Sequence, residues 1–319
     1  MKNKTRIHRM VAIALAVLLV VVCFSVVLGQ RGSQAATVYT TLDRMILPNS
    51  PIPSTIHPYD VSKFSEFGYG QYRYGAGLGY DERLDIMSAD YSNANVTEVS
   101  SLLRFFAMTD VHLTDKESPA QAVYFGIRED GIVSGYSPAM SYSTQMLNAA
   151  VQTVNEINKK DSLDFGLFLG DLGNSGQYNE LRWFIDTLDG KMINPDSGIK
   201  DDPVPGPNND YQDEFKAVGL DSSIPWYTAL GNHDHFWVGT NPPTDNMTKT
   251  YIGPDILKIG DIFTPGGFYR SDFYVGTVDG STPDGTPIGA GPVNSTVPIT
   301  VASDPNRRFI SVAEWMNEF

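Results

Sequence analysis

Three short polar clusters in the sequence combine the residue types that bind divalent metal ions. They are Asp110-Val111-His112, Gly170-Asp171 and Gly231-Asn232-His233-Asp234. Carboxylate, imidazole and amide oxygen together suit iron, manganese or zinc, and no thiol accompanies them because the single cysteine is Cys23. A carboxylate such as Asp171 can bridge two ions held roughly 3.5–4 Å apart, which is the arrangement of two-metal displacement reactions. These residue types therefore predict metal-assisted chemistry at a phosphoryl group.

The last cluster also contains a candidate acid. An unligated histidine such as His233 can protonate a leaving oxygen, and a neighbouring carboxylate such as Asp234 can orient it. A Gly-Asn-His-Asp run is expected by chance only about 0.002 times in such a chain, against about 0.4 times for Asp-x-His. Asn174 and His235 are candidate substrate contacts. The alternatives are a left-handed turn for Asn174, and a metal ligand or a solvent-facing side chain for His235.

The elements that must position these residues can be predicted from the apolar pattern. Each cluster follows an apolar run that is typical of a buried strand, at residues 102–108, 165–169 and 224–230. Helical spacing predicts helices at 143–160, with Ser143 as the N-cap, and at 178–188. Alternating strands and helices predict β-α-β units whose loops meet at one edge of a sheet. Residues 190–223 are predicted to form a surface insertion, and no helical period follows Phe236 until Val312.

These clusters, in this order, resemble the calcineurin-like metallophosphoesterase superfamily, which includes purple acid phosphatases and secreted phosphodiesterases. The resemblance covers about residues 102–236. It implies an α/β (α+β) fold in which two β-sheets pack as a sandwich flanked by helices. It also implies that Asp110 and His112 bind one metal, that Asp171 bridges and that Asn232 binds the second. His233 would then be the catalytic acid.

The chain departs from the family pattern in one respect. Family members carry a lone histidine and then a Gly-His-x-His motif after the third cluster, whereas no histidine follows His235 here. We therefore expect the sandwich to be incomplete at its C-terminal end. Two divalent ions (Fe, Mn or Zn) are expected for the family, and one or fewer bound tightly by this chain alone. A second, C-terminal polypeptide is an expected partner.

The N-terminus has the pattern of an export signal or a membrane anchor. Lys2, Lys4, Arg6 and Arg9 precede an uncharged apolar stretch at residues 10–28, and a small-x-small cleavage pattern ends at Ala35. We therefore divide the chain into a signal or anchor at 1–35, an irregular extension at 36–100 and the phosphoesterase domain at 101–319. Both N-terminal alternatives predict an extracytoplasmic location: secreted, periplasmic or on the cell surface.

Composition narrows the functional classes. The net charge of −14 argues against nucleic-acid binding by bulk charge. It would also repel an anionic phosphate substrate, so metal cations must make the electrostatic potential positive at the binding site. We predict an exported metal-dependent phosphoesterase that hydrolyses phosphate mono- or diesters. The alternative is a non-catalytic envelope protein or a partner-binding fragment that needs a second polypeptide to complete its site.

Overall fold

A computed structural model describes the chain in several stretches. The described residues are 37–50, 63, 65–68, 70–92, 97, 100–121, 138–254, 258–259, 273–274, 291–292 and 301–319. By their internal contacts, the residues divide into two units, Met1–Val38 and Tyr39–Phe319. The predicted signal or anchor at 1–35 lies outside the described residues. Within the described part of the chain, no helix is long and apolar enough to cross a membrane.

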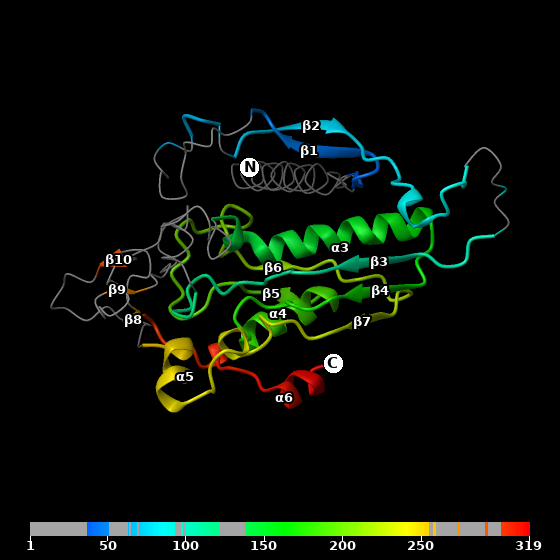
Figure 1. The fold of residues 1–319 in the computed structure, drawn as a ribbon. Helices are drawn as coiled ribbons and strands as arrows, with labels where there is room; N and C mark the ends of the chain where they lie inside the picture. Colours follow the sequence, from blue (N-terminus) through cyan, green and yellow to red (C-terminus); the bar gives the residue numbers. More distant parts are fainter. Residues whose placement is uncertain are drawn as a thin grey trace, which may run out of the picture. The chain divides into compact units, whose positions relative to one another are not determined.

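A three-stranded parallel sheet forms the centre of the second unit. Its strands are β3 (Phe105–Met108), β4 (Phe165–Phe168) and β7 (Trp226–Thr228), in the order β3-β4-β7. Phe105 pairs with Phe165, and Gly166 pairs with Trp226. All three strands lie within the predicted apolar runs. Their parallel pairing confirms that the chain is a mixed α/β protein built from β-α-β units (Figure 1).

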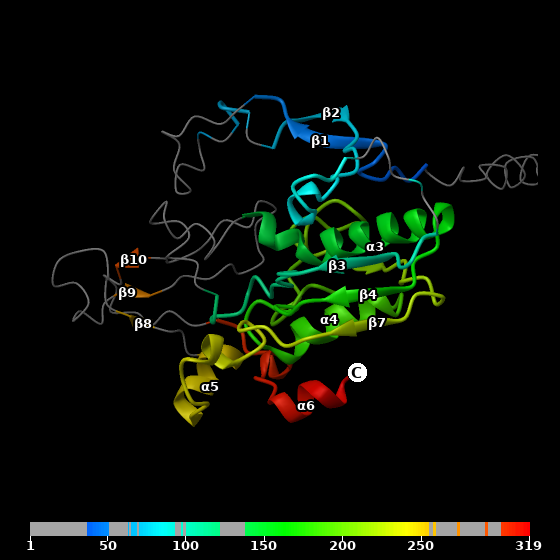
Figure 2. The same cartoon turned by 45° about the vertical axis from the view of Figure 1, so that its right-hand side comes forward.

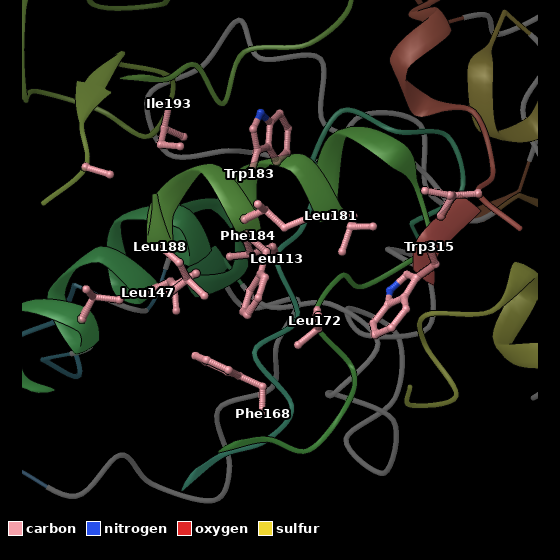
Figure 3. Packing of buried hydrophobic residues seen from close by; sticks show 14 residues of the cluster. Leu113, Leu147, Phe168, Leu172, Leu181, Trp183, Phe184, Leu188, Ile193 and Trp315 are labelled. Atoms are coloured by element: carbon pink, nitrogen blue, oxygen red, sulfur yellow. The ribbon is translucent and has the colours of Figure 1, made fainter. Parts of the chain in front are cut away.

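Two helices connect these strands and cover one face of the sheet. α3 (Ser143–Lys160) lies between β3 and β4 in the sequence, and α4 (Tyr178–Leu188) lies between β4 and β7. Both helices have the predicted bounds. Phe168 meets Phe184 of α4 edge to face, with 4.9 Å between ring centroids. Figure 3 shows Leu147 of α3 and Leu181, Phe184 and Leu188 of α4 in the core around Phe168.

The opposite face of the sheet is apolar and open to solvent. Side chains alternate between faces along a strand, so Phe105, Phe165 and Tyr227 lie together on this side. Phe105 stacks on Phe165 at 5.0 Å, and Tyr227 is 60% exposed. The described elements therefore form one helix-covered sheet, with no second sheet on this face.

The C-terminal segment returns to the core of the same unit. A short helix, η8 (Pro305–Arg307), precedes α6 (Val312–Asn317), which begins at the predicted residue. Trp315 of α6 is buried in the main core, and the Phe319 ring lies 5.6 Å from that of Trp226 in β7. Both views show α6 beside the β7 side of the sheet (Figure 2).

The remaining elements are short. β1 (Arg44–Pro48) and β2 (Tyr72–Ala76) pair antiparallel in the predicted extension, which also holds the 3-10 helix η2 (Leu84–Ile86). β5 (Met192–Ile193) and β6 (Phe215–Lys216) pair antiparallel within the predicted insertion. β8 (Lys258–Ile259), β9 (Phe273–Tyr274) and β10 (Gly291–Pro292) form a third small sheet.

Two local predictions were wrong. Ser143 is not an N-cap; it is the first residue of α3, after the short helix η5 (Pro138–Tyr142), and its hydroxyl accepts the N–H of Thr114. A further helix, α5 (Asp245–Ile252), follows the short helix η6 (Phe236–Gly239), where no helix was predicted. The side chain of Thr244 caps α5 by accepting the N–H of Met247.

Candidate metal centre

The loops after the three parallel strands meet at one edge of the sheet. Asp110 follows β3, Asp171 follows β4, and His233 follows β7. Backbone hydrogen bonds hold the first two loops together: the N–H of Asp110 donates to Gly170 O at 3.3 Å, and that of His112 donates to Asp171 O at 2.9 Å. The third loop joins them through the N–H of His233, which donates to Asp171 Oδ1 at 2.8 Å. The topology thus brings the predicted clusters together, as parallel strands require.

Four of the predicted side chains form one group, which we call the candidate metal centre: Asp110, His112, Asp171 and His233. One ligand atom from each of His112, Asp171 and His233 lies within 4.8 Å of the others. His112 Nε2 is 3.5 Å from Asp110 Oδ1 and 3.8 Å from Asp171 Oδ2. The two imidazole rings lie 4.4 Å apart, nearly at right angles. Two nitrogens and several carboxylate oxygens at this spacing suit a divalent transition metal.

The backbone is strained at three of these residues. Asp110, His112 and Asp171 have φ values of 54°, 47° and 54°, in the left-handed region that side chains other than glycine rarely adopt. Such conformations cost of order 1–3 kcal/mol each and persist where the surroundings enforce them, often at functional sites. All three residues lie in the loops that follow β3 and β4. The strain is therefore an independent sign that this edge of the sheet is functional.

Asn174 orients both histidine rings, a role that differs from the predicted substrate contact. Its Oδ1 accepts a hydrogen bond from His112 Nδ1 at 2.9 Å, and its backbone carbonyl accepts one from His233 Nδ1 at 2.7 Å. With both Nδ1 atoms donating, Nε2 of each neutral ring carries the lone pair. The Asn174 Nδ2 donates to Gln121, so both ends of this amide are engaged within the protein.

Asp234 organises the loops and does not contact the His233 ring. Its buried carboxylate accepts the backbone N–H groups of Asp171, Leu172, Gly173 and Gly231, at 2.9, 3.0, 3.3 and 2.9 Å. Burial raises the pKa of Asp234, and these four donors oppose that rise. In the structure, the Asn174 carbonyl orients His233, whereas the sequence had assigned this role to the Asp234 carboxylate.

Two other predicted residues lie in the third loop without joining this hydrogen-bond network. Asn232 has an exposed side chain, and its carbonyl accepts the N–H of His235. The ring of His235 is half-buried, and its nitrogens have no hydrogen-bond partner among the described residues. The structure leaves Asn232 accessible for a metal ion and gives His235 no partner within the candidate metal centre.

Sequence reasoning missed the buried polar residues beneath the candidate metal centre. Gln121 accepts from Asn174 and donates to Ser175 Oγ and Glu180 Oε1. Burial raises the pKa of Glu180 to about 8, although the N–H groups of Asp115 and Ser175 donate to it. No local motif marks either residue, because their partners lie up to 65 positions away.

A pocket of about 410 Å³ borders the candidate metal centre. Its wall includes Asp110 and His112 together with the apolar side chains of Met140, Met146 and Ala150. Asp110 is exposed there, and the Thr109 hydroxyl and the adjacent His112 hold the pKa of its carboxyl below the usual range. A substrate in this pocket would thus meet a carboxylate and an imidazole beside an apolar surface.

A family model described as calcineurin-like phosphoesterase matches residues 103–286, more than half of the chain. The chain belongs to the calcineurin-like phosphoesterase family. Neither the curated proteins nor the solved structures yield a significant match. The matched range includes the whole candidate metal centre, so this part of the chain carries the calcineurin-like phosphoesterase domain. The predicted resemblance is thereby confirmed.

Proposed function

We propose that the chain is a metal-dependent phosphoesterase that hydrolyses phosphate mono- or diesters at the candidate metal centre. One observation carries this proposal: nitrogen and oxygen ligand atoms of His112, Asp171 and His233 converge within 4.8 Å at the carboxyl edge of the sheet. Family membership supports the reaction class, since calcineurin-like phosphoesterases typically use two divalent ions.

The residues present fit a divalent metal. His112 Nε2 is free to bind because Asn174 holds the proton on Nδ1, which is the usual way a protein fixes a histidine ligand. Asp110 and Asp171 would complete the first set of ligands, and Asn232 would contribute an amide oxygen to a second. When bound, divalent ions at such a site polarise the phosphoryl group and lower the pKa of a water molecule.

His233 would supply the proton to the leaving oxygen. Its Nδ1–H is held by the Asn174 carbonyl at 2.7 Å, which fixes the orientation of the ring. The proton would then leave from Nε2, the other ring nitrogen. Because His233 also offers a ring nitrogen to the group of possible metal ligands, the two roles must be separated by experiment.

The test combines metal content with two substrates. The full chain is loaded with Mn²⁺ or Zn²⁺, its metal is measured by elemental analysis, and hydrolysis of p-nitrophenyl phosphate and an alkyl phosphate is followed. His233→Ala should keep its metal and lose more activity on the alkyl phosphate, whose poor leaving group needs protonation. Asp171→Asn should lose metal and activity, whereas the surface variant Asp189→Asn should retain both. Full activity of His233→Ala on both substrates would contradict the assigned acid.

A second sheet on the open apolar face would complete the proposed sandwich. The exposed Phe105, Leu169 and Tyr227 support this proposal, because an exposed apolar patch marks a surface that packs against another element. The covering strands would come from this chain or from the proposed second polypeptide. Without them, the chain would be the alternative, a non-catalytic, partner-binding protein. Protection of Tyr227 from surface labelling, with and without co-expressed partner candidates, would test this proposal.

We also propose an extracytoplasmic location. The basic residues Lys2 to Arg9 followed by the apolar stretch 10–28 support export, whether the segment is cleaved or remains as an anchor. Fractionation of cells that express a C-terminally tagged chain, with N-terminal sequencing of the product, would separate these two outcomes. Tagged protein in the cytoplasm alone would contradict the proposal.

A further inference from the structure

The pocket of about 410 Å³ at the candidate metal centre is lined by Asp110, His112, Met140, Met146 and Ala150, and we call it the apolar pocket. Its volume is that of a site for a small organic molecule. Asp110 and His112 belong both to its wall and to the candidate metal centre, so the two are one continuous site. A phosphate ester bound at the candidate metal centre can therefore reach into the apolar pocket with its organic group.

One face of α3 supplies much of the apolar wall. Met146, Leu147 and Ala150 lie on the same side of this helix because their spacing is close to one helical turn. Met108, at the end of β3, and Val111, in the loop that follows it, add to the wall. Leu147 is buried in the main core, whereas Met146 is 60% exposed. Met146 thus offers a flexible apolar side chain that can adapt to a bound group.

The polar side chains of this wall already have partners. The Thr109 hydroxyl donates to the carboxylate of Asp110, and the Ser143 hydroxyl accepts a backbone N–H from the loop after β3. His112 is held through its Nδ1, which leaves Nε2 for a metal ion. Among the described residues that line the apolar pocket, none carries an amide, an ammonium, a guanidinium or a benzene or indole ring. A sugar would thus find few hydrogen-bond partners there, and a nucleobase no such ring on which to stack.

A second pocket, of about 610 Å³, has the opposite character. It lies between α3 and the insertion, and none of the described residues that line it belongs to the candidate metal centre. Five amide side chains line it: Gln145, Asn148, Gln152, Asn208 and Asn209. The chain thus places amides in the second pocket and methionines beside the candidate metal centre. Ala149 and Met192, which also line the second pocket, supply matched control positions.

We propose that the substrate of the candidate metal centre is a phosphate ester of an aliphatic alcohol, whose alkyl chain occupies the apolar pocket. This inference rests on the proposed phosphoesterase function and adds the class of the ester group. Burial of one methylene group in an apolar site strengthens binding about fourfold. Affinity and kcat/KM should therefore rise with the length of the alkyl chain until the apolar pocket is full.

The test measures binding and turnover along one series of chain lengths. Alkylphosphonates from methyl to hexyl, whose carbon–phosphorus bond resists hydrolysis, are titrated by calorimetry into the full chain loaded with Mn²⁺. Alkyl phosphates of the same lengths are measured as substrates. We expect the affinity and kcat/KM to rise about fourfold per methylene group. The heat-capacity change of binding should become more negative as the chain lengthens, because more apolar surface is buried.

Substitutions at two adjacent residues of α3 locate the alkyl chain. Ala150→Leu fills the apolar pocket and should reduce the gain to less than about twofold per methylene group. Ala149→Leu, at an exposed residue that lines the second pocket, should keep the slope of the parent. Met146→Ala should weaken the binding of hexylphosphonate at least about threefold. Met192→Ala removes a similarly exposed methionine of the second pocket and should not change that affinity.

The outcomes separate this inference from the hydrolysis itself. Binding that strengthens with chain length, without turnover, would support the alkyl site and contradict the phosphoesterase function. Turnover with the same affinity and kcat/KM at every chain length would support hydrolysis and overturn the inference. A slope that is the same in Ala150→Leu and Ala149→Leu would overturn it too, because the alkyl chain would then bind elsewhere. Failure of every phosphonate to bind would have the same consequence.

Discussion

Replacing Asp234 with alanine should destabilise the protein strongly, because this one carboxylate joins two loops. It accepts four backbone N–H groups, from Asp171, Leu172, Gly173 and Gly231, and is 4% exposed. A hydrogen bond to a charged group contributes about 1.5–3 kcal/mol, and such values are not additive when the bonds share an acceptor. Loss of the carboxylate leaves several buried donors unpaired. We therefore expect a loss of about 3–5 kcal/mol.

Urea unfolding of the full chain, followed by tryptophan fluorescence, measures this loss. With a slope of about 2 kcal/mol per M, the midpoint of Asp234→Ala should fall by about 2 M. Asp234→Asn keeps one accepting oxygen and so should lose about half as much. The control Asp189→Ala removes a surface carboxylate paired with Lys191 and should change stability by less than about 0.5 kcal/mol. An unchanged midpoint in Asp234→Ala would refute the reasoning and return Asp234 to its predicted role beside His233.

Other contacts lead to equally direct tests. Asn174→Ala removes the acceptor for His112 and should weaken Mn²⁺ binding, measured by calorimetry, about 10–100-fold. Asn174→Asp keeps an acceptor and should restore the affinity. Equal affinity of the parent and both variants would exclude the orienting role. Burial raises the pKa of Glu180 from 4.5 to about 8, so its contribution to stability is complete below pH 4.5 and is lost as the pH rises through 8. The urea midpoint should accordingly fall between about pH 5 and 9, and a Glu180→Gln variant with the same fall would contradict this. Trp315→Ala empties a buried site and should cost about 3–5 kcal/mol, whereas Met316→Ala on the exposed side should be nearly neutral.

The sequence was sufficient to predict which elements and loops form the site, but not which side chains contact one another in it. Apolar residues such as Leu147, Val151 and Val154 recur at helical spacing, which located α3 to the residue. Parallel strands with helical crossovers necessarily bring their following loops to one edge, so the meeting of Asp110, Asp171 and His233 followed from topology. These predictions depend on periodicity and connection rules, which a single sequence contains.

The role of each side chain depends on the direction in which it points, and the sequence alone does not give that direction. Asp234 follows His233 directly, yet its carboxylate turns inward to the backbone while the His233 ring turns toward His112. Asn174 could not be assigned to both histidines because each contact spans about sixty residues. α5 was missed because its sequence, DNMTKTYI, has too few apolar residues to show a helical period.

The buried pair between Asp115 and Arg307 also constrains the order of folding during synthesis. Its partners are 192 positions apart, and Arg307 further contacts Ser197. Before the ribosome has made residue 307, the loop after His112 holds a carboxylate that has no guanidinium partner. The nascent chain can therefore form β3, β4 and their helices early, but the loop after β3 reaches its native contacts only after residue 307 has left the exit tunnel.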